Sequence, residues 1–219
     1  MDKTDPLENI IDLPSRDIEL ICAYLSKKDA KMRKAIETVG PFNLKRNGEK
    51  DIFSSLVRSI IYQQLNGKAA ASIYGRFKDN FGKKVCPAPR LIDSASDDEL
   101  RSCGISKSKL RAIRSLCEHH AAGNIPSEKE ARNLSEEEII EKLTAVTGVG
   151  LWTAQMILIF HLGKPDILPH TDYGVKKGFQ KLYFPRSNDV PDEARLIEKA
   201  RRWSPYRSVA SWYLWRILD

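Results

Sequence analysis

The chain has 219 residues and a formal net charge of +7, with 36 lysines and arginines against 29 aspartates and glutamates. This length is sufficient to bury a core, either as one domain or as two closely associated lobes. Charges of both signs are mixed along the sequence, which predicts a globular protein with a basic face rather than a basic tail. A basic face is the minimum electrostatic requirement for binding nucleic acid, although proteins of many other functions share it.

The cysteines and the hydropathy pattern exclude further classes of protein. The four cysteines are scattered without a CxxC pair, which argues against a zinc site or an iron–sulfur cluster. Free thiols are typical of a reducing compartment. The first ten residues, MDKTDPLENI, are polar and acidic and do not read as a signal peptide, and no apolar run is long enough to span a membrane. We therefore expect a soluble intracellular protein.

In chain order, the spacing of apolar residues predicts helices throughout, with no strand-like alternation. Residues 1–14 are expected to form a loose arm. The expected helices lie at about 15–25, 29–38, 52–61, 68–81, from 97, from 107 to about 122, from 136 to about 146, 151–162, 173–184, 192–203 and 206–218. The fold class is therefore all-α.

The most informative stretch runs from 143 to 162 and reads LTAVTGVGLWTAQMILIFHL. An amphipathic helix and an apolar helix flank Thr147, Gly148, Val149 and Gly150, and two glycines around one apolar residue allow a tight turn. The helix that begins after Gly150 presents unpaired N–H groups and the positive end of its dipole, which favour a phosphate. The pattern predicts a helix-hairpin-helix, which holds the DNA backbone without reading sequence. A plain helical hairpin with a glycine turn is the alternative.

An aspartate follows this hairpin at a short distance, in the run PDILPHTD from Pro165 to Asp172. The hairpin and the aspartate together resemble the helix-hairpin-helix superfamily of DNA glycosylases, and the resemblance extends from about Phe53 to Trp215. It implies one glycosylase domain over 1–219, a two-lobed helical bundle with a DNA-binding cleft between the lobes. Residues from about 56 to 160 would form one lobe. Residues from about 15 to 55 and 165 to 219 would form the other.

The resemblance implies that Asp172 is catalytic. Breaking an N-glycosidic bond places positive charge on the sugar, as in glycoside hydrolysis. A carboxylate beside that carbon stabilises the charge and orients the attacking water. The alternative is that Asp172 only caps the helix that follows it, which aspartate often does.

One position narrows the branch of the superfamily. Members that also cut the DNA strand carry a Schiff-base lysine two residues after the second hairpin glycine, where this chain has Trp152. Tryptophan forms no imine, so the chain resembles monofunctional alkylpurine glycosylases such as the bacterial 3-methyladenine DNA glycosylase II and the yeast alkyladenine enzymes. Trp152, Tyr173 and Trp215 match positions of the base pocket there, and aromatic faces attract cationic alkylated purines. Core packing is the alternative for Trp152 and Trp215.

The resemblance also assigns contacts to DNA and to a cation. The helix from 52 ends in adjacent amides, of which Gln64 matches the side chain that the family inserts into the minor groove. Gln63 would hydrogen-bond the neighbouring bases, whereas the alternative for both is a solvated turn. In relatives the hairpin binds a monovalent cation through backbone carbonyls, which here are those of Thr144, Val146 and Val149.

These features predict a monofunctional DNA glycosylase that flips and excises alkylated purines, of the 3-methyladenine and 7-methylguanine type, from duplex DNA. It would start base excision repair, act as a monomer on double-stranded DNA, and need no cofactor besides a structural Na+ or K+. We expect it in the cytoplasm of a prokaryote or the nucleus of a eukaryote, and on no membrane. A non-catalytic module that binds damaged DNA is the alternative. A mismatch or oxidised-base glycosylase is disfavoured by the missing lysine and the missing four-cysteine cluster.

Overall fold

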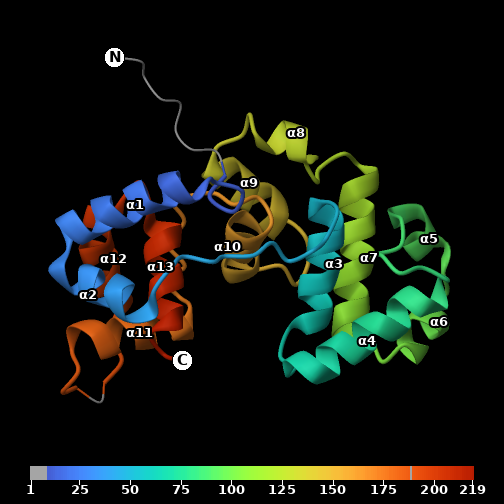
Figure 1. Cartoon of the computed structure of the whole chain (residues 1–219). Helices are drawn as coiled ribbons and strands as arrows, with labels where there is room; N and C mark the ends of the chain where they lie inside the picture. Colours follow the sequence, from blue (N-terminus) through green and yellow to red (C-terminus); the bar gives the residue numbers. More distant parts are fainter. Residues whose placement is uncertain (1–8, 188) are drawn as a thin grey trace. The chain divides into compact units, whose positions relative to one another are not determined.

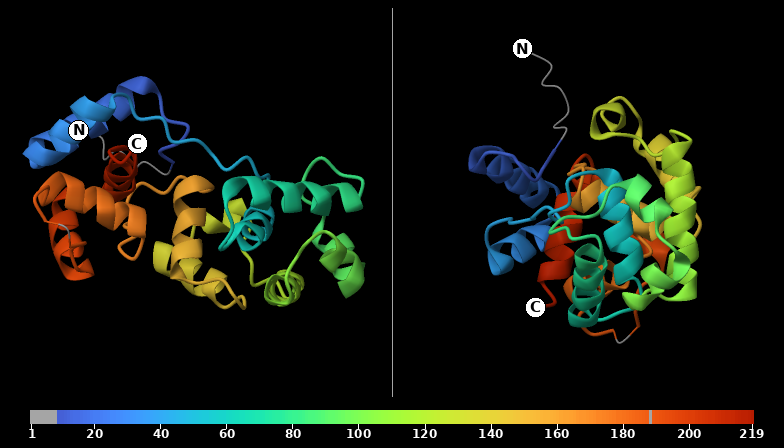
Figure 2. Two further views of the ribbon diagram at one scale, coloured as in Figure 1. Left: turned by 90° about the horizontal axis from the view of Figure 1, so that it is seen from below. Right: turned by 90° about the vertical axis from the view of Figure 1, so that its right-hand side faces the viewer.

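The computed structural model describes residues 9–187 and 189–219, and within them the secondary structure is helical, without strands (Figures 1 and 2). The predicted all-α fold class is confirmed. The helices are α1 (Ser15–Lys28), α2 (Ala30–Val39), α3 (Ile52–Tyr62), α4 (Gly67–Asn80), α5 (Pro89–Ser94), α6 (Asp97–Ser102), α7 (Lys107–Ala121), α8 (Glu128–Ala131), α9 (Glu136–Thr144), α10 (Leu151–Phe160), α11 (Tyr173–Tyr183), α12 (Glu193–Ala200), the 3-10 helix η1 (Arg201–Trp203) and α13 (Arg207–Arg216). None of these helices is long and apolar enough to cross a lipid bilayer.

The chain forms two compact units. The terminal unit comprises the residues up to Arg46 together with Leu158–Asp219, and the middle unit comprises Asn47–Ile157. The sequence places residues 47–55 with the terminal helices, whereas in the structure they belong to the middle unit. Ile52 and Phe53 begin the buried face of α3, which packs along α7 within that unit.

Residues 9–14 are not a loose arm, although the sequence predicts one. Ile10 is buried, and its N–H donates to the carbonyl of Gly163 at 2.8 Å. The side chain of Asn9 accepts from the N–H of Ile11 at 2.8 Å and holds the segment in its turn. The buried side chain of Ile10, its hydrogen bond to Gly163 and the ion pair between Asp12 and Arg46 therefore fix this segment to the terminal unit. The remainder of the predicted arm, residues 1–8, lies outside the described residues.

The middle unit follows directly from its apolar spacing and its capping residues. Asp51 caps α3 by accepting the N–H of Ser54 at 2.7 Å, as its position before the apolar run predicts. Ser135 and Glu138 form a capping box at the start of α9, a pairing typical of serine followed three residues later by glutamate. Helices α3 and α7 lie side by side in this unit (Figure 1), and each buries its apolar residues. Local signals therefore determine most of this unit.

In the terminal unit, α11 packs closely against α13. Gly178 makes this possible, because an added Cβ would lie only 1.9 Å from the carbonyl oxygen of Leu214. The backbones of the two helices thus approach at a position where any side chain would overlap the neighbouring main chain. This contact holds the start of α11 and the end of α13 at a fixed distance from each other.

A buried carboxylate ties four elements of the terminal unit together. Asp29 is 4% exposed, and its Oδ1 caps α2 by accepting from the N–H groups of Lys31 and Met32. Its Oδ2 accepts from the hydroxyl of Tyr183 at 2.6 Å and the indole N–H of Trp203 at 3.2 Å, and lies 3.3 Å from the Lys199 ammonium. Burial raises the pKa of this carboxyl, but the hydrogen bonds and the Lys199 charge outweigh burial and hold the pKa below its ordinary value of 3.8.

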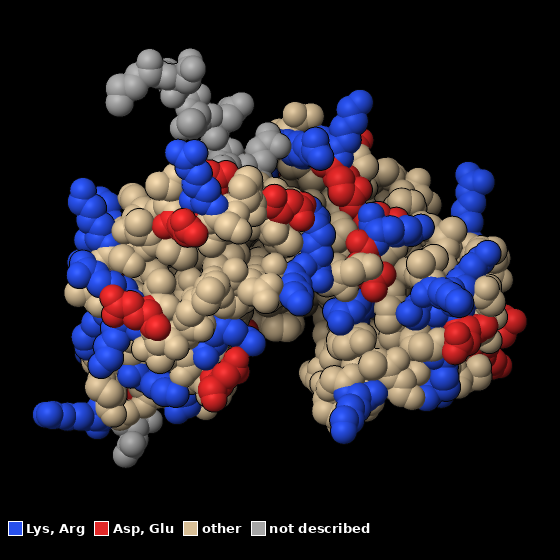
Figure 3. All heavy atoms as spheres, viewed as in Figure 1, with Lys and Arg blue, Asp and Glu red and all other residues tan. Residues whose placement is uncertain are grey.

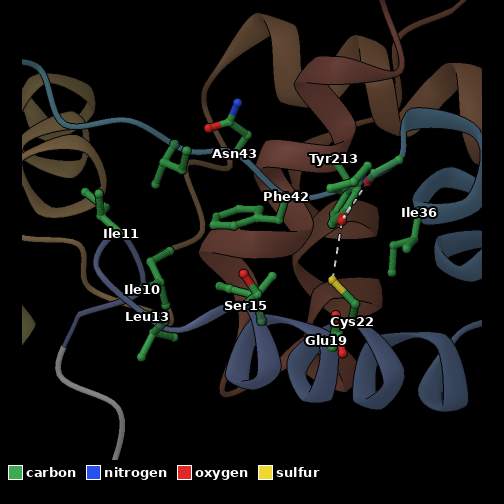
Figure 4. Close-up of a pocket in the computed structure, with 14 residues that line it drawn as sticks. Ile10, Ile11, Leu13, Ser15, Glu19, Cys22, Ile36, Phe42, Asn43 and Tyr213 are labelled. Carbon is green, nitrogen blue, oxygen red and sulfur yellow. Dashed lines mark hydrogen bonds between the residues drawn. The ribbon is translucent and has the colours of Figure 1, made fainter.

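The terminal unit also contains a hollow of about 380 Å³, lined by the segment after Asn9, by α1, by the stretch after α2 and by α13 (Figure 4). Cys22 lies at its wall, with its sulfur 3.3 Å from the hydroxyl of Tyr213. None of the residues predicted to bind a base lines this hollow. It is therefore distinct from the predicted base pocket.

The Asp29 contacts predict a pH-dependent contribution to stability. Asp29→Ala is expected to lower the free energy of unfolding by about 3 kcal/mol at pH 7, because it leaves buried donors and the ammonium of Lys199 without their acceptor. Because the pKa of Asp29 is lower in the folded state, its ionisation stabilises the fold at any pH above the unfolded-state pKa near 3.8. This contribution is lost as the pH falls through the folded-state pKa. Urea unfolding between pH 7 and pH 3 should therefore show the difference from wild type shrinking in acid. Asp79→Asn, at an exposed position of α4, is the control, and an equal loss at both ends of the pH range would contradict the prediction.

Candidate functional site

The hairpin between α9 and α10 has the tight turn that its two glycines predict. Gly148 has a φ of +80°, and an added Cβ there would lie 3.1 Å from the Cβ of Ala112 on α7. Val149 is buried, and its N–H donates to the carbonyl of Val146 at 3.0 Å. The valine therefore fills the angle between the helices, while the glycine supplies a backbone conformation that other residues rarely adopt.

The outer edge of the hairpin presents backbone donors to solvent. The N–H of Thr147 is satisfied by the hydroxyl of Ser115 at 3.1 Å. Gly148 and Gly150 are exposed, and among the described residues no protein acceptor receives their N–H groups. No atom lies within 4 Å of a Cβ added at Gly150, so the space in front of it is open. These donors and the start of α10 suit an anion such as a phosphate.

The turn after α3 is attached to this hairpin. The side-chain amide of Gln63 donates to the carbonyl of Gly148 at 3.0 Å and to the hydroxyl of Thr153 at 3.4 Å. Lys109 donates to the carbonyl of Ile61 at 2.8 Å, and burial lowers the pKa of its ammonium. The end of α3, the hairpin and α7 thus form one hydrogen-bonded framework within the middle unit. The predicted contact of Gln63 with bases stays a prediction.

Gln64 has an unusual backbone conformation. Its φ is +56°. In the part of the chain that the structure describes, every other residue with a positive φ is a glycine. Such a conformation costs about 1–2 kcal/mol for a residue with a Cβ, and it points to function where the surrounding structure maintains it. The side chain is exposed, as a minor-groove wedge requires. Its insertion into DNA stays a prediction.

In the terminal unit, Asp172 caps α11, which is the alternative to catalysis that the sequence leaves open. Its Oδ1 accepts the N–H of Val175 at 2.8 Å. The same oxygen accepts the indole N–H of Trp215, also at 2.8 Å. Trp215 lies 43 residues later, near the end of α13. Asp172 therefore does cap α11. It also accepts a second hydrogen bond, from Trp215, which capping does not require.

The run before Asp172 is fixed to the start of α13. Asp166 accepts two hydrogen bonds from the guanidinium of Arg207, at 2.8 and 2.9 Å, and one from the Arg207 N–H at 3.0 Å. The hydroxyl of Ser208 accepts the N–H of Ile167 at 2.9 Å and donates to the carbonyl of Lys164 at 2.7 Å. Sequence reasoning missed these positioning residues, because the partners are about 40 residues apart and no spacing rule relates them.

The predicted base-pocket aromatics divide between the units. Trp152 is 45% exposed in the middle unit, so core packing does not account for it. Tyr173 is 66% exposed in the terminal unit, beside Asp172. Trp215 is half-buried, and the centre of its ring lies 5.6 Å from that of Phe160. The structure thus brings Asp172, Tyr173 and Trp215 together in the terminal unit.

The predicted cation site depends on backbone carbonyls, so side chains give little information about it. Among the described residues, no cluster of three or more His, Cys, Asp or Glu side chains is suited to a metal ion. The carbonyl of Val146 accepts from Val149 within the hairpin turn, and the hydroxyl of Thr144 bonds back to Ile140 at 2.8 Å. A Na+ or K+ held by the carbonyls of Thr144, Val146 and Val149 stays a prediction.

Comparison with known proteins agrees with this geometry. Residues 57–205 match the family described as HhH-GPD superfamily base excision DNA repair protein. DNA-3-methyladenine glycosylase 1 of Schizosaccharomyces pombe is 34% identical over 88% of this chain and 84% of that protein. The structure of the Schizosaccharomyces pombe 3-methyladenine DNA glycosylase in complex with abasic DNA is similar, with a TM-score of 0.79, 34% identity and coverage of 90% of this chain and 95% of that one.

A second solved structure, of a DNA-3-methyladenine glycosidase from Bacillus halodurans, has a TM-score of 0.80 and 36% identity over 93% of this chain and 88% of that one. Sequence and structure therefore agree over nearly the full length of the chain and of these relatives. The chain belongs to the HhH-GPD superfamily of base excision DNA repair proteins, within its 3-methyladenine DNA glycosylase branch.

Proposed function

We propose that this protein is a monofunctional DNA glycosylase that flips and excises alkylated purines, of the 3-methyladenine and 7-methylguanine type, from duplex DNA. The product is an abasic site, and the reaction starts base excision repair. The observation that carries the proposal is the fixed carboxylate of Asp172 in a chain of this family. Relatives named for 3-methyladenine glycosylase activity match most of the chain and support it.

The reaction needs charge stabilisation more than it needs an acid. An N3- or N7-alkylated purine already carries positive charge and leaves without protonation by the protein. As its bond to the sugar breaks, positive charge develops on the sugar ring, and the Asp172 carboxylate stabilises that charge and orients the attacking water. Two N–H donors hold Oδ1 in place, so little reorganisation is needed during the reaction.

The aromatic residues suit an extruded cationic base. Tyr173 is exposed directly after the catalytic residue, and the N–H edge of the Trp215 ring contacts the Asp172 carboxylate. A cation over an aromatic face gains about 0.5–2 kcal/mol, most of all over tryptophan. We assign these two residues to the base pocket, and Trp152 stays a prediction from the family resemblance. Shape and stacking would then select the damaged base.

Double-stranded DNA is the proposed partner. The N–H groups of Gly148 and Gly150 and the start of α10 would hold a phosphate, and Gln64 would fill the space left by the flipped nucleotide. The solved structure of a relative in complex with abasic DNA supports this assignment. Lys and Arg side chains lie among Asp and Glu on the face drawn in Figure 3, which agrees with a net charge of +7 and no basic tail. A bound Na+ or K+ at the hairpin carbonyls would add positive charge beside the phosphate.

Asp172 separates the enzyme from a binding module of the same fold. Asp172→Asn and Asp172→Ser both keep a side chain that can cap α11. The free energy of unfolding should therefore change by no more than about 1 kcal/mol. Removal of the carboxylate should slow the release of 3-methyladenine from alkylated duplex DNA at least about 100-fold, while duplex affinity persists. Asp192→Asn at the cap of α12 is the matched control. Base release by Asp172→Asn at the wild-type rate would assign the catalytic role to another residue, whereas no base release by the wild-type protein would favour the non-catalytic module.

The tryptophan at the lysine position predicts no strand cleavage. Incubation with alkylated duplex and borohydride should trap no covalent protein–DNA adduct, and the strand should break only after added alkali, because Trp152 forms no imine. Gel electrophoresis of both reactions, beside a strand-cutting member of the superfamily, makes the measurement. An adduct trapped at a lysine of this chain would overturn the monofunctional assignment.

The open space at Gly150 allows a clean test of the hairpin. Gly150→Ala places a methyl group where no protein atom lies within 4 Å, so it should obstruct a phosphate without disturbing the fold. Affinity for damaged and undamaged duplexes should fall by the same factor, since phosphate contacts carry no sequence information. Gly75→Ala, also in open space but on α4, is the control. Wild-type affinity for undamaged duplex in Gly150→Ala would reject the phosphate site.

A further inference from the structure

Gly174 is a residue of the site that the proposed function leaves unexplained. It is the second residue of α11, and its φ is not positive, so the backbone there does not require glycine. Helix propensity alone favours alanine at such a position. A glycine in the first turn therefore needs another physical reason.

The reason is that a larger side chain at position 174 would overlap Trp215 and Asp172. A Cβ added at Gly174 would lie 2.8 Å from Cδ1 and 3.1 Å from Nε1 of Trp215, and 3.1 Å from Oδ1 of Asp172. These are the two atoms of the indole–carboxylate hydrogen bond and the ring carbon beside them. Cβ atoms essentially never approach other atoms to within 3.0 Å, so one of the partners would have to move.

The surroundings decide which partner moves. The helices cannot separate easily, because Gly178, one turn later on α11, lies directly against the backbone of Leu214. Asp172 is held by its cap on Val175, which is part of the same helix as Gly174. The indole of Trp215 is the remaining partner, and it is held by Phe160 and by the hydrogen bond to Asp172. An added Cβ would therefore push the indole off the carboxylate.

We propose that Gly174 is a positioning residue for base excision, which keeps open the space where the indole N–H of Trp215 contacts the carboxylate of Asp172. This inference rests on the proposed function and adds a residue to it. It also gives Trp215 two functions, because its ring face would meet the base while its N–H orients the carboxylate. Gly174 thus sets the distance between the Trp215 ring, which would bind the base, and the catalytic carboxylate of Asp172.

The test is Gly174→Ala. Single-turnover excision of 3-methyladenine should slow between about tenfold and about 100-fold, because a displaced catalytic group loses its alignment. Affinity for undamaged duplex and the melting temperature should stay close to wild type. The ¹H–¹⁵N indole resonance of Trp215, assigned by its loss in Trp215→Phe, should shift when its hydrogen bond to the carboxylate breaks.

Two further variants make the result specific. Gly75→Ala on α4 has open space around the added methyl group and should change none of these measurements. Trp215→Phe removes the N–H, so Gly174→Ala combined with Trp215→Phe should lose much less than the product of the two single losses. This non-additivity distinguishes action through the indole from a general effect on α11.

The outcomes are separable. An unchanged indole resonance with wild-type excision in Gly174→Ala would overturn the inference. An excision rate that falls in proportion to a lowered melting temperature, with the indole resonance unmoved, would also overturn it and make Gly174 a packing residue like Gly178. If the wild-type protein released no alkylated base, the proposed function would fail, and the indole resonance would still decide whether Gly174 positions Trp215 on Asp172.

Discussion

The site depends on one carboxylate oxygen that accepts two N–H groups. Oδ1 of Asp172 accepts hydrogen bonds from the backbone N–H of Val175 and the indole N–H of Trp215, both at 2.8 Å. The first donor belongs to the helix that Asp172 caps, and the second comes from the last turn of another helix. The carboxylate orientation is therefore correct only when α11 and α13 are correctly placed. Charge-assisted hydrogen bonds of this kind are stronger than neutral ones and hold an ionised group with little freedom.

Most of the terminal unit maintains that placement. Asp166 and Arg207 fix the run that leads to Asp172, Gly178 allows α11 to touch the backbone of α13, and Asp29 joins α2 to α11, α12 and η1. In the middle unit, hydrogen bonds between the end of α3, the hairpin and α7 give the expected DNA contacts a similar common support. Each set of predicted site residues is thus attached to a hydrogen-bonded framework within its own unit.

The sequence predicts what is local. The helices, the cap at Asp51 and the glycine turn at Gly148 follow from spacing over a few residues, whereas the choice of Asp172 rests on the family resemblance. It does not predict pairs distant in the chain, such as the indole of Trp215 on Asp172 or the amide of Gln63 on the Gly148 carbonyl. The N-terminal segment shows the same limit, since the buried Ile10 and contacts with the distant Gly163 and Arg46 order residues that look like a polar arm.

The positive φ of Gln64 has a consequence for the evolution of this turn. Glycine, asparagine and aspartate enter the left-handed region most readily, whereas β-branched residues are strongly disfavoured there. If the same backbone turn is kept among descendants of this chain, valine, isoleucine and threonine are poor replacements whatever their fit to a DNA groove. The repertoire of side chains at this position is then restricted by backbone geometry before selection for damage recognition begins.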